Sequence, residues 1–211
     1  SVTSTSGVVS LLAGGQLSGS GELDLSGSTW VLGGNFDKGP VGGSQLSGTL
    51  TISQTDLKLA NNSTLTSDES LNFVNLNLND YALTLGSSTS DLTVQNPIII
   101  DSITEGISTV GADLTLLASL NISNGNVTSN GGIISLLGGG QLSGSGILDV
   151  TDSSWVLAGN FVKSSGNLII SNTDLTLGGS ATLTSDEALS FVTLNLNDFT
   201  LILGSSTSDL T

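Results

Sequence analysis

Two pairs of adjacent carboxylates are the candidates for chemistry in this sequence: Asp68 with Glu69, and Asp186 with Glu187. Both pairs stand in the same hexapeptide pattern, Thr-Ser-Asp-Glu-x-Leu. Because hard cations prefer carboxylate and carbonyl oxygens, either pair could supply ligands to Ca²⁺. Two carboxylates could also form the acid and base of a glycoside hydrolase, although neighbouring side chains in a strand point apart. The third interpretation is a solvated turn that holds no ligand. Ca²⁺ is the one cofactor that we consider.

The missing residue types exclude most other chemistry. The chain has three Lys, no Arg, His, Cys or Met, and a net charge of -15. It therefore lacks an imidazole base, a thiolate nucleophile and soft metal ligands. Its acidic surface would repel the phosphates of nucleic acid, so we expect no nucleic-acid partner. We identify no catalytic residue and expect a protein that is not an enzyme.

The acid pairs belong to a long internal repeat, which must be recognised before any fold is assigned. Ser10–Phe36 returns as Ser135–Phe161 with 20 of 27 positions identical. Leu65–Thr93 returns as Leu183–Thr211 with 23 of 29 positions identical. The first offset is 125 residues and the second is 118, and the difference of seven predicts a loop insertion near residues 39–45. We therefore expect one continuous domain, in which residues 1–125 form the first copy and residues 126–211 an incomplete second copy.

The apolar residues within each copy alternate with polar ones. Leu57 and Leu59, Leu76 and Leu78, and Leu83 and Leu85 are such period-two pairs, and each copy contains them. Strict alternation predicts strands with one buried face, and a helical pattern is absent. Gly, Asn and Ser separate runs of four to six residues, as turns do.

Short strands that recur along a repetitive chain predict an all-β fold, a parallel β-solenoid (β-helix). Aspartates recur at a nearly regular interval, for example from Asp56 to Asp80 and from Asp174 to Asp198. We therefore expect coils of about 24 residues, which bury their leucines by stacking at the strand spacing of about 4.8 Å. An antiparallel sandwich is the competing fold, but it does not predict a repeat of coil length.

The two tryptophans of the chain, Trp30 and Trp155, occupy equivalent places in the two copies. A tryptophan in this position could stack on a sugar, as in an adhesin, but a large core residue is the interpretation that we prefer. Asn75, Asn77 and Asn79 alternate with leucines, which predicts either a hydrogen-bonded ladder or a plain polar face. No segment approaches 18 consecutive apolar residues, so we expect no transmembrane helix.

The recurring patterns resemble those of a known class of proteins. Ser171–Thr184 and the Gly-Ser-Gly-x-Leu-Asp segments at Gly19–Asp24 and Gly144–Asp149 resemble bacterial β-strand-repeat surface proteins, which include autotransporter passengers and filamentous-haemagglutinin-like adhesins. The resemblance implies an extracellular or cell-surface β-helical fibre that serves in adhesion, biofilm formation or surface coating. It carries no active-site residues over to this chain.

The expected function is therefore that of a structural segment. We expect end-to-end self-association into a homopolymeric fibre, with surface glycans as further candidate partners. Two alternatives remain open: a β-helix enzyme that acts on polysaccharides, and a module that binds calcium or a glycan.

Overall fold

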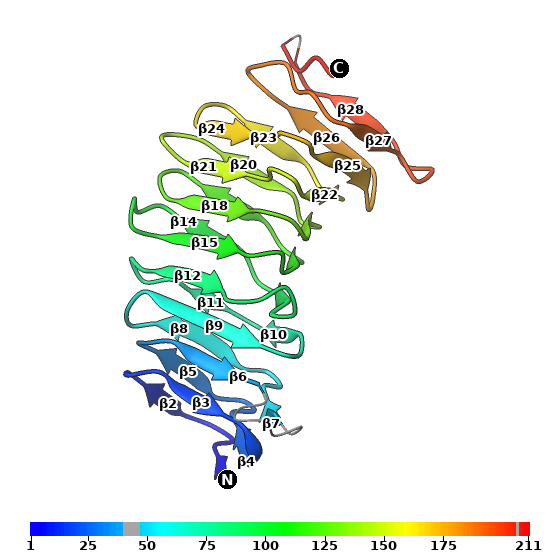
Figure 1. Cartoon of the computed structure of the whole chain (residues 1–211). Coiled ribbons are helices and arrows are strands. Elements are labelled where there is room, and N and C mark those ends of the chain that lie inside the picture. The colour runs from blue at the N-terminus through cyan, green and yellow to red at the C-terminus, as the bar shows by residue number, and fades with distance from the viewer. Residues whose placement is uncertain (40–46, 206) are drawn as a thin grey trace.

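The chain forms a β-solenoid in which parallel strands stack in about nine turns of about 21 residues. The computed structural model of the chain describes residues 1–39, 47–205 and 207–211. Among these residues there is no helix, and every pairing between two strands is parallel. The turns climb from the N-terminal end of the stack to the C-terminal end (Figure 1). The predicted fold class is confirmed.

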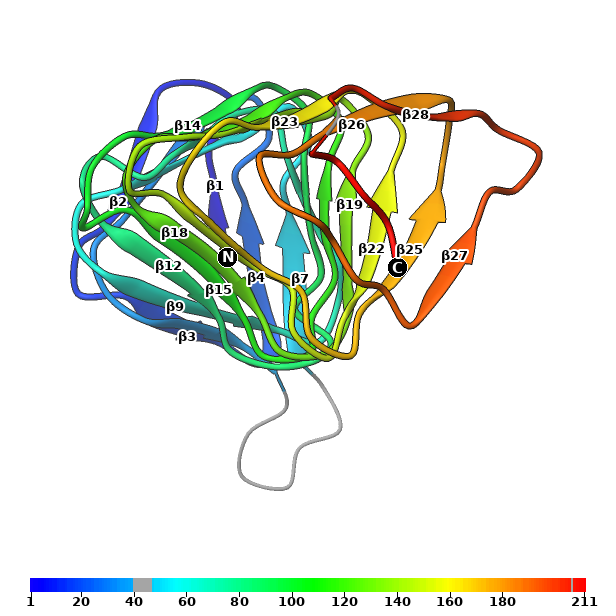
Figure 2. The same ribbon diagram turned by 90° about the horizontal axis from the view of Figure 1, so that it is seen from above.

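Most turns contribute three strands, one to each of three faces, and the last two turns contribute strands to faces one and two (Figure 2). Face one begins with a three-stranded sheet and continues in a seven-stranded sheet: β1 (Val2–Thr3), β4 (Gly19–Asp24), β7 (Ser47–Thr51), β10 (Leu71–Phe73), β13 (Leu92–Val94), β16 (Leu114–Leu116), β19 (Ile133–Leu136), β22 (Ser154–Leu157), β25 (Asp174–Leu177) and β27 (Thr193–Asn195).

Face two is built from a four-stranded and a six-stranded sheet: β2 (Val8–Leu11), β5 (Thr29–Leu32), β8 (Asp56–Leu59), β11 (Leu76–Asn77), β14 (Ile98–Ile100), β17 (Leu120–Ile122), β20 (Gly140–Leu142), β23 (Phe161–Lys163), β26 (Ala181–Thr184) and β28 (Leu201–Leu203). Face three is a single eight-stranded sheet: β3 (Gly15–Leu17), β6 (Phe36–Lys38), β9 (Ser63–Ser67), β12 (Ala82–Leu85), β15 (Gly106–Thr109), β18 (Asn126–Ser129), β21 (Ile147–Asp149) and β24 (Asn167–Ile169).

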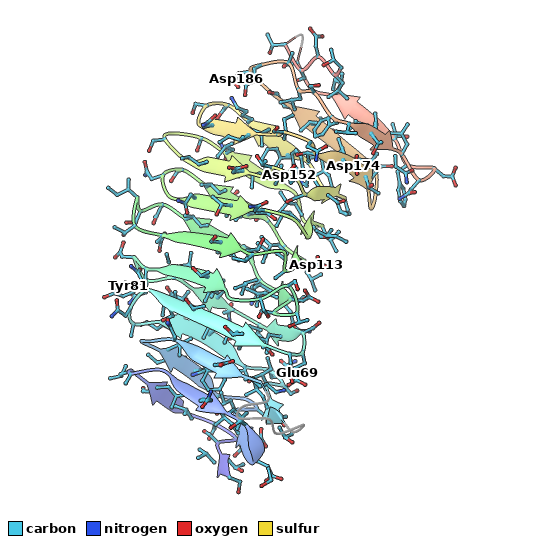
Figure 3. The ribbon with its side chains drawn as sticks, in the orientation of Figure 1. Glu69, Tyr81, Asp113, Asp152, Asp174 and Asp186 are labelled. Carbon is cyan, nitrogen blue, oxygen red and sulfur yellow. The ribbon has the colours of Figure 1, made fainter. Side chains whose placement is uncertain are left out.

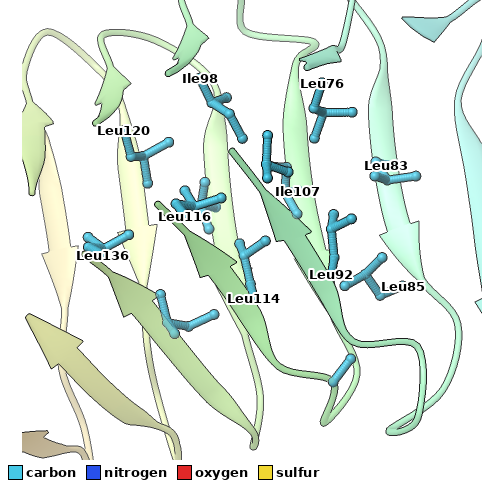
Figure 4. Close-up of a cluster of buried hydrophobic side chains, with 14 of the residues drawn as sticks. Leu76, Leu83, Leu85, Leu92, Ile98, Ile107, Leu114, Leu116, Leu120 and Leu136 are labelled. Carbon is cyan, nitrogen blue, oxygen red and sulfur yellow. The ribbon is translucent and has the colours of Figure 1, made fainter. Parts of the chain in front are cut away.

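The alternating apolar residues line the inside of the stack. Leu57 and Leu59 on β8 are fully buried, and Lys58 between them points outward. Parallel register places each inward residue on the inward residue of the next turn, as Leu92 lies on Leu114. Figure 4 shows how such leucines and isoleucines from successive turns fill the interior. Burial of each such side chain contributes about 1.5–3 kcal/mol, so the apolar interior stabilises the stack.

The coil is shorter than the length of about 24 residues that was predicted from the interval between aspartates. Register partners on successive turns lie about 21 residues apart, as Val127 and Leu148 do. Aspartates at the longer interval are not register partners. Asp149 and Asp174 are a further pair at this interval, and Asp149 ends β21 on face three, whereas Asp174 begins β25 on face one. Their spacing therefore measures one turn plus a step to the next face.

One turn of the first copy is longer than the others. Val9 pairs with Trp30 and Trp30 pairs with Leu57, so the second of these two turns spans more of the sequence than the first. The predicted insertion near residues 39–45 falls within this longer turn, and all of it except Gly39 lies outside the described residues.

The long repeat and the turn of the solenoid are out of phase by one face. Trp30 lies on β5 in face two, and its counterpart Trp155 lies on β22 in face one. β22 follows β5 by 17 strands, one strand short of six full turns. The same step separates β6 from β23 and β9 from β26. Equivalent sequences therefore pack on different faces of the stack, which shows that the faces offer similar surroundings.

Glycines at the corners allow the turns to approach one another. Gly14 has a φ of +75°, and a Cβ atom there would lie 2.0 Å from the carbonyl oxygen of Asn35 on the next turn. Gly139, its counterpart in the second copy, has a φ of +70° and meets Asn160 at the same distance. A side chain at either position would force two turns apart, so the sequence needs glycine here.

Candidate functional site

The acid pairs lie at two corners of the solenoid beside buried lysines. Lys38 ends β6 at an inward position, between Leu17 on the preceding turn and Ser67 on the following one. Its side chain is only 3% exposed. Lys163 ends β23 in the same way, above Leu142, and is 4% exposed. Two of the three cations of the chain therefore occupy positions that leucines fill elsewhere.

Each buried ammonium contacts both carboxylates of one acid pair. Lys38 Nζ lies 2.6 Å from Asp68 Oδ1 and 3.2 Å from Glu69 Oε1. We call these three residues the first lysine cluster. The two acid side chains remain 37% and 48% exposed, so they lie between the buried ammonium and solvent.

The second lysine cluster has the same arrangement one long repeat later. Lys163 Nζ contacts Asp186 Oδ1 and lies 3.2 Å from Glu187 Oε1. Glu69 and Asp186 lie on different sides of the stack in Figure 3, as the step of one face requires. The cluster is therefore a feature of the repeat and not of one particular face.

A hydroxyl network holds each acid pair in place. The backbone N–H of Glu69 donates to Ser67 Oγ at 3.1 Å, and the N–H of Ser67 donates to Ser90 Oγ at 2.9 Å. Both serines are buried. The second copy repeats these bonds with Glu187, Ser185 and Ser208. The equal spacing of the two serines in each copy thus helps to position the carboxylates over the ammonium.

Burial and ion pairing act on the lysines in opposite directions. Desolvation lowers the pKa of Lys163, but hydrogen bonds to Asp186 and Glu187 outweigh it, so the pKa is raised above its ordinary 10.5. The pKa of Lys38 is raised for the same reasons. The hydrogen bond from Lys163 in turn lowers the pKa of Asp186. Both lysines are therefore protonated at neutral pH, and neither amine is a nucleophile there.

The structure places the four predicted calcium ligands against a cation that the protein itself supplies. Asp68, Glu69, Asp186 and Glu187 each face a lysine ammonium, and Ca²⁺ would have to displace it. Within the described residues, no three acidic, histidine or cysteine side chains gather as a metal site would require. Calcium binding stays a prediction that competes with the ion pairs.

Sequence reasoning missed the two buried lysines. The sequence contained a signal for their burial, because Lys38 follows Phe36 by two residues and Lys163 follows Phe161 in the same way. Alternation puts both members of each pair on the inside of a strand. The phenylalanines are buried as that pattern predicts.

The tryptophans are core residues, as preferred from the sequence. Trp30 and Trp155 are fully buried, so neither indole is available to stack on a sugar. Trp30 meets Phe36 edge to face, with ring centroids 4.9 Å apart, and Trp155 meets Phe161 in the same way at 5.1 Å. Among the residues that the structure describes, the indole N–H groups of both tryptophans have no hydrogen-bond partner.

A polar hollow of about 390 Å³ lies on the outside of face three. Hydroxyl groups and the carboxylates of Asp149 and Asp152 line it. Asp149 accepts hydrogen bonds from the N–H and the hydroxyl of Thr151, at 3.0 and 2.6 Å, and Asp152 accepts one from Asn172. Both acids thus hold the local backbone or the next turn.

Part of the asparagine run forms the predicted ladder. Asn75 donates to Asp56 on the preceding turn at 2.7 Å and accepts from Asn96 on the following turn at 2.9 Å. Asn79 instead donates to the carbonyl of Leu59. These bonds join adjacent turns, two of them between exposed side chains and one to a backbone carbonyl, and they serve the stack itself.

No protein-family model, curated protein or solved structure matches the chain. The function must therefore be argued from the geometry. In the described residues no helix is long and apolar enough to cross a membrane.

Proposed function

We propose that this chain is a non-enzymatic structural segment of an extracellular or cell-surface bacterial fibre. One observation supports the proposal most directly. The repeat rebuilds the same Trp–Phe packing and the same lysine cluster at two levels of the stack. The tryptophans, the buried lysines and the acid pairs therefore serve to hold the turns together. A protein selected for a single active site would have one such arrangement and a cleft beside it.

The mechanical properties follow from the strand ladders. Parallel strands that stack at about 4.8 Å give a rod, on the order of 40 Å long for nine turns. The acidic, hydroxyl-rich exterior keeps such a rod soluble and discourages lateral association. Adhesion, biofilm formation or surface coating would then depend on end-to-end self-association and on contacts with surface glycans.

Small-angle X-ray scattering and negative-stain electron microscopy of the purified chain test the rod. We expect an elongated particle of constant cross-section that associates through its ends. A spherical particle would overturn the proposal. Protease treatment of intact producing cells tests the location, because a surface fibre is cleaved under conditions that spare cytoplasmic proteins.

The two alternatives give different results in binding and turnover experiments. A polysaccharide-acting enzyme would release sugars from a glycan panel, and Asp68→Asn with Asp186→Asn would abolish that release. A glycan-binding module would retain a glycan without cleaving it. The polar hollow on face three is the surface where such binding would first be sought, with Asp152→Ala as the variant.

A further inference from the structure

The chain contains two Asn-Gly dipeptides, Asn124–Gly125 and Asn130–Gly131, and a serine precedes each of them. Asparagine is a chemically labile residue, and a following glycine adds to this, because it has no side chain to hinder attack by its own backbone nitrogen on the asparagine amide. The shared sequence Ser-Asn-Gly makes the two dipeptides directly comparable. Their surroundings in the fold differ.

Asn124 lies at the corner between β17 and β18, where hydrogen bonds hold both ends of its side-chain amide. Its Nδ2 donates to the backbone carbonyl of Asp101 at 2.8 Å, and its Oδ1 accepts a hydrogen bond from Ser145 Oγ at 2.9 Å. Gly125 is buried, and its N–H donates to the carbonyl of Ser102 at 3.1 Å. Neighbouring turns therefore fix both groups that would have to react.

Asn130 lies at the corner between β18 and β19, and its exposed side chain lines the polar hollow of face three. Within the described part of the chain, neither its side-chain amide nor the N–H of Gly131 has a hydrogen-bond partner. Gly131 has a φ of +83°, and even a Cβ atom there would come no closer than 3.6 Å to Gly111. Its carbonyl accepts hydrogen bonds from Ser129 and Ser153, so the corner is held beyond the free N–H.

We propose that Asn130 is a site of spontaneous deamidation in the folded chain and that Asn124 is protected from the same reaction. The backbone nitrogen of Gly131 gives its proton to a base in the solvent and forms a bond to Cγ of Asn130. The bond between Cγ and Nδ2 breaks, and Nδ2 takes up a proton from the solvent and leaves as ammonia. The product of this step is a succinimide ring.

Hydrolysis of the ring by solvent water completes the reaction. Water opens the ring at Cγ to give aspartate, or at the backbone carbonyl carbon of Asn130 to give isoaspartate, whose main chain is longer by one methylene. Either product adds a carboxylate to the hollow that Asp149 and Asp152 line, and so changes the charge of the surface where glycan binding would first be sought. The reaction needs neither an enzyme nor a partner, so it does not depend on the proposed fibre.

Incubation of the folded chain at mildly alkaline pH, followed by peptic digestion at acid pH and mass spectrometry, measures deamidation at each asparagine. We expect Asn130 to react faster than Asn124 by on the order of 10–100-fold, because Asn124 and Gly125 must first break three hydrogen bonds. In urea the two sites should react at similar rates. Similar rates in the folded chain, or an Asn130 that reacts only in urea, would overturn the proposal.

Two variants test the reason for the difference. Ser145→Ala removes one hydrogen bond from the side chain of Asn124, so deamidation of Asn124 in the folded chain should become several-fold faster while that of Asn130 is unchanged. Asn130→Asp provides the aspartate product, against which isoaspartate is separated by chromatography of the peptides. An Asn124 that reacts no faster in Ser145→Ala, or an Asn130 that yields no isoaspartate, would contradict the proposed protection or the succinimide route.

Discussion

Lys38 Nζ lies 2.6 Å from Asp68 Oδ1, with the ammonium inside the solenoid and the carboxylate at its surface. A buried ammonium depends on its partners more than they depend on it, because the carboxylates can still be hydrated when the lysine is absent. The relationship is therefore asymmetric, and substitutions on its two sides should have different effects.

Removal of the carboxylates should destabilise the chain more than removal of the lysine. We expect Asp68→Asn with Glu69→Gln to lower the free energy of unfolding by about 1–3 kcal/mol, because a charged group is left buried without its counter-charge. Lys38→Met keeps the buried volume and should change stability by less than about 1 kcal/mol. Urea unfolding followed by circular dichroism measures both. The Lys163 cluster provides the matched set, and a larger loss from Lys38→Met would contradict the assignment.

The second lysine cluster should contribute less to the free energy of unfolding at both extremes of pH. The lowered pKa of Asp186 means that its contribution is present above the ordinary value of 3.8 and is lost as the pH falls through the lower folded value. The raised pKa of Lys163 means that its contribution is present below 10.5 and is lost as the pH rises through the higher folded value.

The measurement is the urea midpoint of the wild type minus that of Lys163→Met, from pH 2 to pH 11. The subtraction cancels the effect of the other carboxylates on the urea midpoint, because these groups are present in both proteins. The difference should be constant near neutral pH and change below pH 4 and above pH 10. A difference that is flat across the whole range would show that the ion pair does not affect folding.

Calcium should have little effect on stability, because a lysine ammonium already pairs with both candidate ligands of each cluster. Scanning calorimetry with Ca²⁺ or with EDTA should give the same melting temperature. In Lys38→Met with Lys163→Met the acid pairs lose their counter-ions, and any calcium effect should be confined to this variant. A rise in the melting temperature of the wild type with Ca²⁺ would favour the calcium-binding alternative.

Gly139 should be irreplaceable because of contact with the next turn. A Cβ atom at this residue would collide with the carbonyl oxygen of Asn160, 2.0 Å away. Gly19 is the control, since its φ of +64° is also left-handed but no atom of the described part of the chain lies within 4 Å of its Cβ position. We expect Gly19→Ala to cost about 1–2 kcal/mol from the backbone conformation alone. Gly139→Ala should cost clearly more in the same chemical denaturation experiment, and equal losses would show that the close approach is unimportant.

Alternation made the interior of the solenoid predictable. Leu57 and Leu59, and likewise Leu83 and Leu85, were predicted to face inward and are fully buried. Each pair needs only the local geometry of a strand, which a short segment of sequence specifies. The coil length was wrong because it depends on which strands share a face, and polar residues at corners recur without marking a single face.

The candidate site was predicted only in part for a related reason. The sequence identified Asp68 and Glu69, but their partner Lys38 stands 30 residues earlier, beyond the long turn. A contact across turns depends on the register of the stack, and the sequence specifies that register only when the coil length is known.

The step of one face between copies determines how such a rod would meet its surroundings. In an array that keeps this spacing, the outward side chains of each long repeat point about a third of a revolution away from those of the repeat before it. Three repeats complete the circuit, so equivalent groups wind around the axis like a screw thread. A rod that lies on a surface would then present the equivalent groups of at least one repeat to that surface at any rotation about its long axis. Adhesion would not depend on this rotation.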